Sequence, residues 1–215
     1  MDRSIYLQYQ EAWDSLFSIG KPRTFNPGEI IYMQGDRDMG LVVLREGQIK
    51  NCVYFCSGLE KTVTILEAPA VSGETALIDD GVCLNSAQAV TKADVIIIPS
   101  QEALEFLESH PKIMMLLLKS YARKIRGIQL QAESTMFKVQ QKLARMLINF
   151  RSYGIFCEGN EANLAITHEV LAGFLGATRP KVTEALNAFV DAGYIAKSRG
   201  YITIVDHEGL RHLYE

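Results

Sequence analysis

Residues 178–184, TRPKVTE, concentrate hydroxyl, amine, guanidinium and carboxylate groups in seven positions. At the start of a helix, such groups can meet the base edges and phosphates of DNA in the major groove. Arg179 can pair with guanine or phosphate, Lys181 with phosphate, and Glu184 with the amino group of cytosine. The alternative is a solvated first helical turn. The candidate DNA contacts here are Thr178, Arg179, Pro180, Lys181, Thr183 and Glu184.

A second helix and a tight turn are expected immediately before this cluster. Thr167 can cap a helix with an apolar side over residues 170–175, and His168 in its first turn can touch phosphate or solvent. Ala172 is small where two helices must cross, and Gly176 suits a turn that requires positive φ. Two short helices joined in this way predict a helix-turn-helix, in which Thr178 caps the second helix.

A β-wing is expected after Gly193. Residues 194–206 predict two short strands around Ser198-Arg199-Gly200, which would bring Lys197 and Arg199 to backbone phosphate. The charge of the segment 138–215 is only +1, against −4 for residues 1–137. A case for DNA binding must therefore rest on where the basic side chains lie, not on the net charge.

The residues before the long helix predict a different architecture. Short β-branched stretches between residues 25 and 99, separated by Gly and Asp turns, predict an antiparallel barrel or jelly roll. Helices are expected at residues 5–19, stopped by Pro22, and at 101–108. The fold class is therefore α+β, with an N-terminal β-barrel and a C-terminal winged helix-turn-helix.

A long helix is expected from residue 111 to about 137. Apolar residues along it follow the 4-3 spacing of a heptad seam, which favours pairing with a second copy over packing on the barrel alone. The predicted dimerisation residues are Met114, Leu118, Tyr121, Ile125, Ile128 and Ala132. The predicted domains are 1–137 and 138–215, the second opening with a helix over 138–153 that Gly154 ends.

Composition excludes several classes of protein. With 215 residues, 48% apolar and 22% charged, the chain can bury a core and is not disordered. No apolar run approaches the roughly 20 residues of a membrane span, and the first residues do not resemble a signal peptide. Four cysteines without a disulfide pattern favour the cytoplasm. We find no catalytic motif and no metal-ligand spacing, so we expect neither an enzyme nor a metal site.

A barrel, a heptad helix and a winged helix-turn-helix in this order resemble the Crp/Fnr family of bacterial transcription regulators. The resemblance covers nearly the whole chain and rests on the helix-turn-helix and on Phe25–Ile31, Gln34–Asp36, Leu44–Gly47 and Gly73–Leu77. It implies a homodimer on pseudo-palindromic double-stranded DNA, with a small effector between barrel and long helix. A contact with RNA polymerase is possible in this family, but no motif for it can be recognised here.

The resemblance also bears on the effector. Members that bind cyclic nucleotides use Gly-Glu and then Arg-Ser; Gly73-Glu74 matches, but Asn85-Ser86 lacks the arginine. Asparagine cannot replace the bidentate contact of arginine with phosphate, and Ile128-Gln129 stands where cyclic AMP sensors have Thr-Ser. We therefore expect a less charged effector than cyclic AMP. The candidate lining residues are Val63, Leu66, Gly73, Glu74, Asn85, Ser86, Lys124, Ile128 and Gln129.

Two alternatives stay open at this stage. One is a haem-based gas sensor or a redox sensor, although all four histidines lie outside the predicted barrel strands. Cys52 and Cys56, four apart, would face the same side if they lay on one strand, but two ligands are too few for an iron–sulfur cluster. The other alternative is a ligand-binding module that acts through protein contacts.

Overall fold

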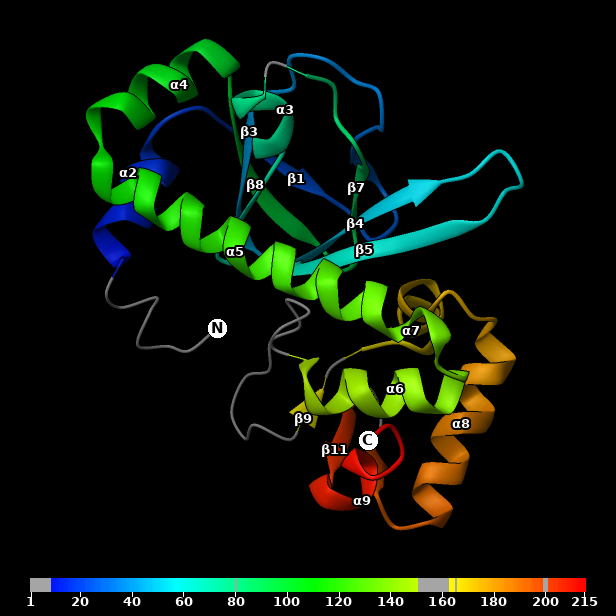
Figure 1. Ribbon diagram of the computed structural model, residues 1–215. Coiled ribbons are helices and arrows are strands. Elements are labelled where there is room, and N and C mark those ends of the chain that lie inside the picture. Colours follow the sequence, from blue (N-terminus) through cyan, green and yellow to red (C-terminus); the bar gives the residue numbers. More distant parts are fainter. Residues whose placement is uncertain (1–8, 80, 151–162, 165, 199–200) are drawn as a thin grey trace. The chain divides into compact units, whose positions relative to one another are not determined.

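The computed structural model describes residues 9–79, 81–150, 163–164, 166–198 and 201–215 (Figure 1). The chain divides into two compact units, Met1–Lys124 and Ile125–Glu215. We refer to them as the N-terminal and C-terminal units. Each has its own buried core. No helix among the described residues is long and apolar enough to cross a membrane.

Two antiparallel four-stranded sheets form the N-terminal unit. One contains, in spatial order, β1 (Lys21–Phe25), β8 (Ala93–Ile98), β3 (Leu41–Glu46) and β6 (Ala70–Ser72); the other contains β2 (Ile30–Tyr32), β7 (Ser86–Ala89), β4 (Gln48–Tyr54) and β5 (Glu60–Glu67). The predicted antiparallel, jelly-roll-like architecture is confirmed. Every β-branched stretch expected as a strand forms one, because alternate side chains enter the core between the sheets.

Strands β1 and β6 were not among those expected. β1 is an edge strand that, among the described strands, pairs with β8 alone, and most of its side chains are exposed, so it carries no apolar alternation. It contains Pro22, which an edge position tolerates. The first helix ends at Ser18, ahead of Gly20 with φ 80°, so the prediction that Pro22 stops it is wrong.

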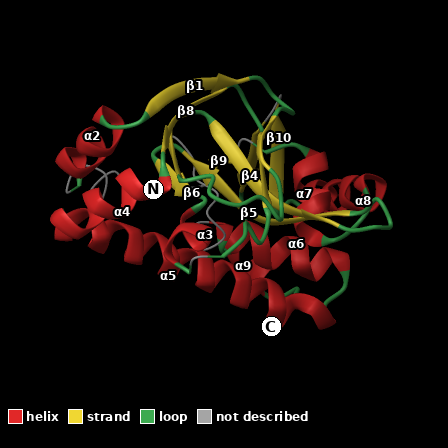
Figure 2. Cartoon of the chain, turned by 90° about the horizontal axis from the view of Figure 1, so that it is seen from above, coloured by secondary structure: helices red, strands yellow, loops and turns green. Residues whose placement is uncertain are grey.

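Helices cover the sheet that contains β3 and β8. These are α2 (Gln10–Ser18), α4 (Ser100–Ser109) and α5 (Pro111–Glu133), while α3 (Glu74–Ile78) follows β6. Trp13 of α2 and Leu107 of α4 are buried in one cluster with Leu41, Ile98 and Leu117. Figures 1 and 2 both show α2 and α4 side by side at one flank of this unit. Apolar burial therefore fixes the start of α5 on the barrel.

Helix α5 has two apolar sides. The α-helix ends at Glu133, and a 3-10 turn, η1 (Ser134–Met136), continues the helical stretch to the residue before Phe137, near the predicted end. Ile113, Leu116 and Leu117 are buried in the N-terminal core. The predicted seam lies elsewhere on the helix, where Leu118 and Ile125 are exposed.

The C-terminal unit is a small helical core with a three-stranded sheet. Its elements are α6 (Val139–Ile148), β9 (Asn163–Leu164), α7 (His168–Leu175), α8 (Arg179–Asp191), β10 (Ile195–Ser198), β11 (Tyr201–Ile204) and α9 (His207–Arg211), with sheet order β10-β11-β9. Two helices and the β10–β11 wing match the prediction, whereas β9 was not expected. Helix α6 ends at Ile148, earlier than predicted, and Gly154 and Arg199 lie outside the described residues.

Candidate nucleic-acid interface and effector site

The turn between α7 and α8 has the expected backbone. Thr167 caps α7, with its Oγ1 accepting a hydrogen bond from the Val170 N–H at 3.2 Å. Gly176 is left-handed, with φ 62° and ψ 41°, and the Ala177 N–H donates to the Ala172 carbonyl at 3.0 Å. Thr178 is the N-cap residue of α8, as predicted, but its side chain makes no capping hydrogen bond.

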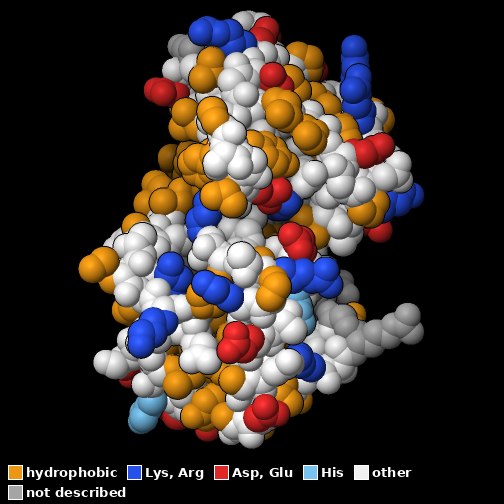
Figure 3. Space-filling view, turned by 90° about the vertical axis from the view of Figure 1, so that its right-hand side faces the viewer, with side chains coloured by type: hydrophobic (Ala, Val, Ile, Leu, Met, Phe, Trp, Pro, Cys, Tyr) orange, Lys and Arg blue, Asp and Glu red, His pale blue; other side chains and the backbone are white. Residues whose placement is uncertain are grey.

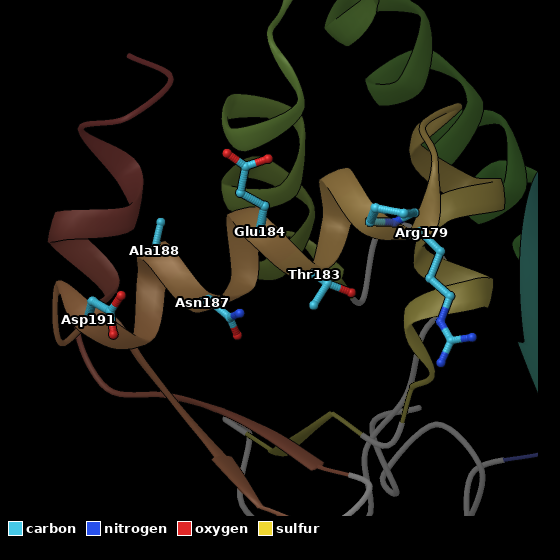
Figure 4. Close-up of a pocket in the computed structure, with 7 residues that line it drawn as sticks. Arg179, Thr183, Glu184, Asn187, Ala188 and Asp191 are labelled. Carbon is cyan, nitrogen blue, oxygen red and sulfur yellow. The ribbon is translucent and has the colours of Figure 1, made fainter.

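Packing leaves one side of α8 to solvent. Val182, Ala185, Leu186 and Phe189 are buried, together with Ala172 on the facing helix. The other side lines a pocket formed by Arg179, Pro180, Thr183, Glu184, Asn187, Ala188 and Asp191 (Figure 4). In the view of Figure 4, Arg179, Thr183 and Asn187 point to one edge of this face and Glu184 points to the other edge. The polar face is thus not buried by the core of its own unit.

Two hydrogen bonds join α8 to its neighbours. His168 Nδ1 on α7 lies 2.9 Å from Thr183 Oγ1, and Lys197 Nζ on β10 donates to Asn187 Oδ1 at 2.6 Å. In the lower half of Figure 3, Lys and Arg side chains are spread over the surface in view. Burial, followed by the charges of Lys197 and Arg179, lowers the pKa of His168 below 6.5. Basic groups therefore converge at this edge of α8.

The predicted DNA-contacting residues are brought onto one module. Arg179, Pro180, Lys181 and Glu184 are exposed, while Thr183 is partly buried. Sequence reasoning missed Asn187 and Asp191, which also line the pocket. The signal was present: Arg179, Thr183 and Asn187 are spaced by four residues and so share one helix face.

Among the predicted effector residues, Glu74 and Lys124 meet in the N-terminal unit. Lys124 Nζ on α5 lies 2.5 Å from Glu74 Oε1 and donates to the Val71 carbonyl at 2.8 Å. Glu74 is only 3% exposed, and its second oxygen, Oε2, has no hydrogen-bond partner. A buried carboxylate is costly unless a positive charge accompanies it, and Lys124 supplies that charge.

Asn85 and Ser86 take part in neutral hydrogen bonds. Ser86 Oγ accepts from the Gln34 N–H at 2.8 Å, and Asn85 Oδ1 accepts from the Tyr32 hydroxyl at 3.3 Å. The Tyr32 and Ser72 hydroxyls lie 2.6 Å apart, and burial raises the pKa of Tyr32. These groups are uncharged, in contrast to the arginine that a cyclic phosphate would require.

The remaining predicted effector residues are divided between the two compact units. Leu66 is buried and Val63 partly buried on β5, and Gly73, with φ 80°, precedes α3. Ile128 and Gln129 belong to the other compact unit, so their membership of an effector site stays a prediction.

The two cysteines considered for redox chemistry do not share a strand. Cys52 lies on β4 and is fully buried, and burial raises the pKa of its thiol. Cys56 is exposed in the turn after β4, so the condition that both cysteines lie on one strand is not met. The described residues contain no group of three His, Cys, Asp or Glu able to hold a metal ion. Haem binding stays an untested alternative.

Each of the two units contains residues that match a known protein domain. The cyclic nucleotide-binding domain matches residues 22–110, and the Crp-like helix-turn-helix domain matches residues 141–213. A cyclic AMP receptor protein from Thermus thermophilus is 24% identical over 194 residues, which cover 90% of this chain and 88% of that protein. A global nitrogen regulator from Nostoc is 24% identical over 186 residues, covering 84% and 83%.

Solved structures share the fold. FixK2 from Bradyrhizobium japonicum superposes with a TM-score of 0.76 at 14% identity, over 92% of this chain and 98% of that one. A CooA variant from Carboxydothermus hydrogenoformans gives the same score at 16% identity, over 92% and 89%. A jelly-roll unit followed by a winged helix-turn-helix defines a class of transcription regulators, not of enzymes. Within that class, the chain belongs to the Crp/Fnr family.

The pKa of His168 in the folded protein lies below its ordinary value of 6.5. As pH falls, His168 is therefore protonated in the unfolded chain before it is protonated in the folded protein. The stability contributed by neutral His168 is therefore fully present above pH 6.5 and is lost as pH drops through the folded-state pKa. An NMR titration of His168 in the intact protein should give a midpoint below 6.5, which Lys197→Gln raises. Lys92→Gln, in the N-terminal unit, is the control. A midpoint at or above 6.5 would contradict this assignment.

Proposed function

We propose that the protein is a homodimeric, sequence-specific DNA-binding regulator that acts in the cytoplasm, where its DNA target would lie. The observation that carries the proposal is the exposed polar face of α8, whose opposite side is buried in its own unit. Arg179 and Lys181 at the start of α8 supply donors for bases and phosphates, and Glu184 supplies an acceptor for base amino groups.

Exposed apolar side chains on α5 support pairing of two copies. Leu118 is 55% exposed, Ile125 61% and Ile128 48%, and heptad spacing puts them on one stripe. Removing such surface from water contributes about 25 cal/mol per Å² of apolar area. Met114 and Tyr121, half-buried, and Ala132, exposed, continue the same stripe.

Pairing along α5 would give the regulator two copies of α8 related by a two-fold axis. Two recognition helices of this kind bind half-sites about one helical turn, roughly 34 Å, apart. The expected operator is therefore a pseudo-palindrome of double-stranded DNA. A single copy would recognise only a half-site, with correspondingly lower specificity.

We further propose control by a small effector other than cyclic AMP. The only cation among the described candidate residues near Glu74 is Lys124, which Glu74 already neutralises, so a cyclic phosphate would lack a free charged partner. A ligand that donates a hydrogen bond to the unpaired Glu74 Oε2 would suit the site better. Lys124 is also the last residue of the N-terminal unit. A ligand that shifts this ion pair would therefore bias α5 between two states of the dimer.

Arg179→Ala should weaken binding to the specific operator by about 1–3 kcal/mol and relax the base preference at one position of each half-site. The reason is the loss of a guanidinium from the exposed face of α8. A fluorescence-anisotropy titration against matched and singly substituted duplexes measures both effects. Arg45→Ala, an exposed arginine of the N-terminal unit, is the control. Unchanged affinity together with unchanged base preference would remove Arg179 from the interface.

Ile125→Glu should convert the dimer to monomer at micromolar concentration, raising its dissociation constant about 100-fold or more, because a charge buried at the seam is costly. Sedimentation equilibrium of the full chain measures this. Met136→Glu is the matched control: Met136 is 91% exposed and lies outside α5, so this variant should remain dimeric. A wild-type chain that sediments as a monomer, with and without DNA, would overturn the dimer.

A further inference from the structure

The hydrogen bond between the wing and the recognition helix has a consequence for how Lys197 acts. Lys197 is paired in register with Ile202, one residue pair before the end of the β10–β11 ladder, where Ser198 faces Tyr201. Its ammonium turns back to α8 and donates to Asn187 Oδ1 at 2.6 Å. The charge of Lys197 is thus presented beside α8 and not at the tip of the wing.

The hydrogen bond between Lys197 and Asn187 also determines which of their polar groups remain available to a ligand. An ammonium carries three N–H donors, and Asn187 takes one of them. Because the Asn187 Oδ1 atom is occupied as an acceptor, its Nδ2 amide remains a donor. Both residues are exposed, and Asn187 lines the pocket on α8 (Figure 4). Two adjacent donor groups and one positive charge match an acceptor-only, anionic ligand.

The surrounding charges favour an anion at this edge of α8. Arg179 leaves the same side of the helix as Asn187, and the charges of Arg179 and Lys197 both act on His168. The two carboxylates of the pocket are Glu184, which points to the other edge of the same face, and Asp191, one turn beyond Asn187 at the end of α8. A phosphate is therefore attracted to the edge with Asn187 and repelled from the edge with Glu184.

Building on the proposed DNA-binding function, we propose that Asn187 is a positioning residue that holds Lys197 against α8, so that the pair clamps one backbone phosphate. An unrestrained lysine loses side-chain entropy when it orders on a phosphate. The bond to Asn187 restricts Lys197 beforehand, which reduces that cost on binding. The ligand class is the DNA phosphodiester, and the contact fixes register without recognising a base.

A double-mutant cycle tests this, with affinity measured across salt concentrations on specific and unrelated duplexes. Lys197→Gln should weaken binding to both about fivefold at 0.15 M salt and reduce the salt slope by about one. Asn187→Leu, which leaves the charge in place, should cost about threefold on both duplexes. The double variant should lose clearly less than the product of the two, because Asn187 acts in large part through Lys197. Lys92→Gln is the charge-matched control and should leave the slope unchanged.

The possible results separate the clamp from the function on which it rests. Multiplicative losses in the double variant, or a changed base preference in Asn187→Leu, would overturn the positioning role while leaving DNA binding intact. An unchanged salt slope in Lys197→Gln would remove the phosphate contact. A wild-type protein that prefers no duplex would reject the proposed function and the clamp together. Thermal unfolding of each variant checks that the exposed substitutions leave the fold unchanged.

Discussion

The close crossing of α7 and α8 is the constraint on which the C-terminal unit depends. Ala172 keeps the helices near each other, and Gly176 takes a left-handed turn that a residue with a Cβ enters only at a cost. Because the apolar side of α8 is buried by this crossing, its polar side faces outward. Thr183 and Asn187 on that side hydrogen-bond to His168 and Lys197, whereas Arg179, at the same four-residue spacing, is exposed. A ligand with acceptor groups would give a reason for that exposed guanidinium.

The N-terminal unit contains a second constraint of a different kind. The buried pair of Glu74 and Lys124 joins α3 to α5, and the unit ends at Lys124. A buried ion pair adds little net stability, but removing either partner leaves an uncompensated charge. The pair therefore fixes where α5 lies on the barrel. A regulator that transmits a signal along α5 would need a contact between the barrel and α5 that a ligand can change. A ligand shifts the equilibrium between two states only if its contacts differ between them.

Sequence alone could predict the features that depend on local periodicity. The β-branched stretches, the glycine turn after Leu175 and the heptad stripe are each visible within a few residues. It could not predict β1, whose exposed edge position leaves no apolar pattern. The sequence also did not predict the partners of Lys124 and Lys197, because each bond depends on tertiary packing. Glu74 lies 50 residues before Lys124 in the chain. Asn187 lies on another element, ten residues before Lys197.

The central claim is that two copies of α8 recognise one symmetric DNA site. Selection from a random duplex library by the purified full-length protein, followed by sequencing of the bound fraction, tests it most directly. We predict enrichment of a two-fold symmetric motif with half-sites about one helical turn apart. Enrichment of an asymmetric single half-site, or of no motif at all, would contradict it.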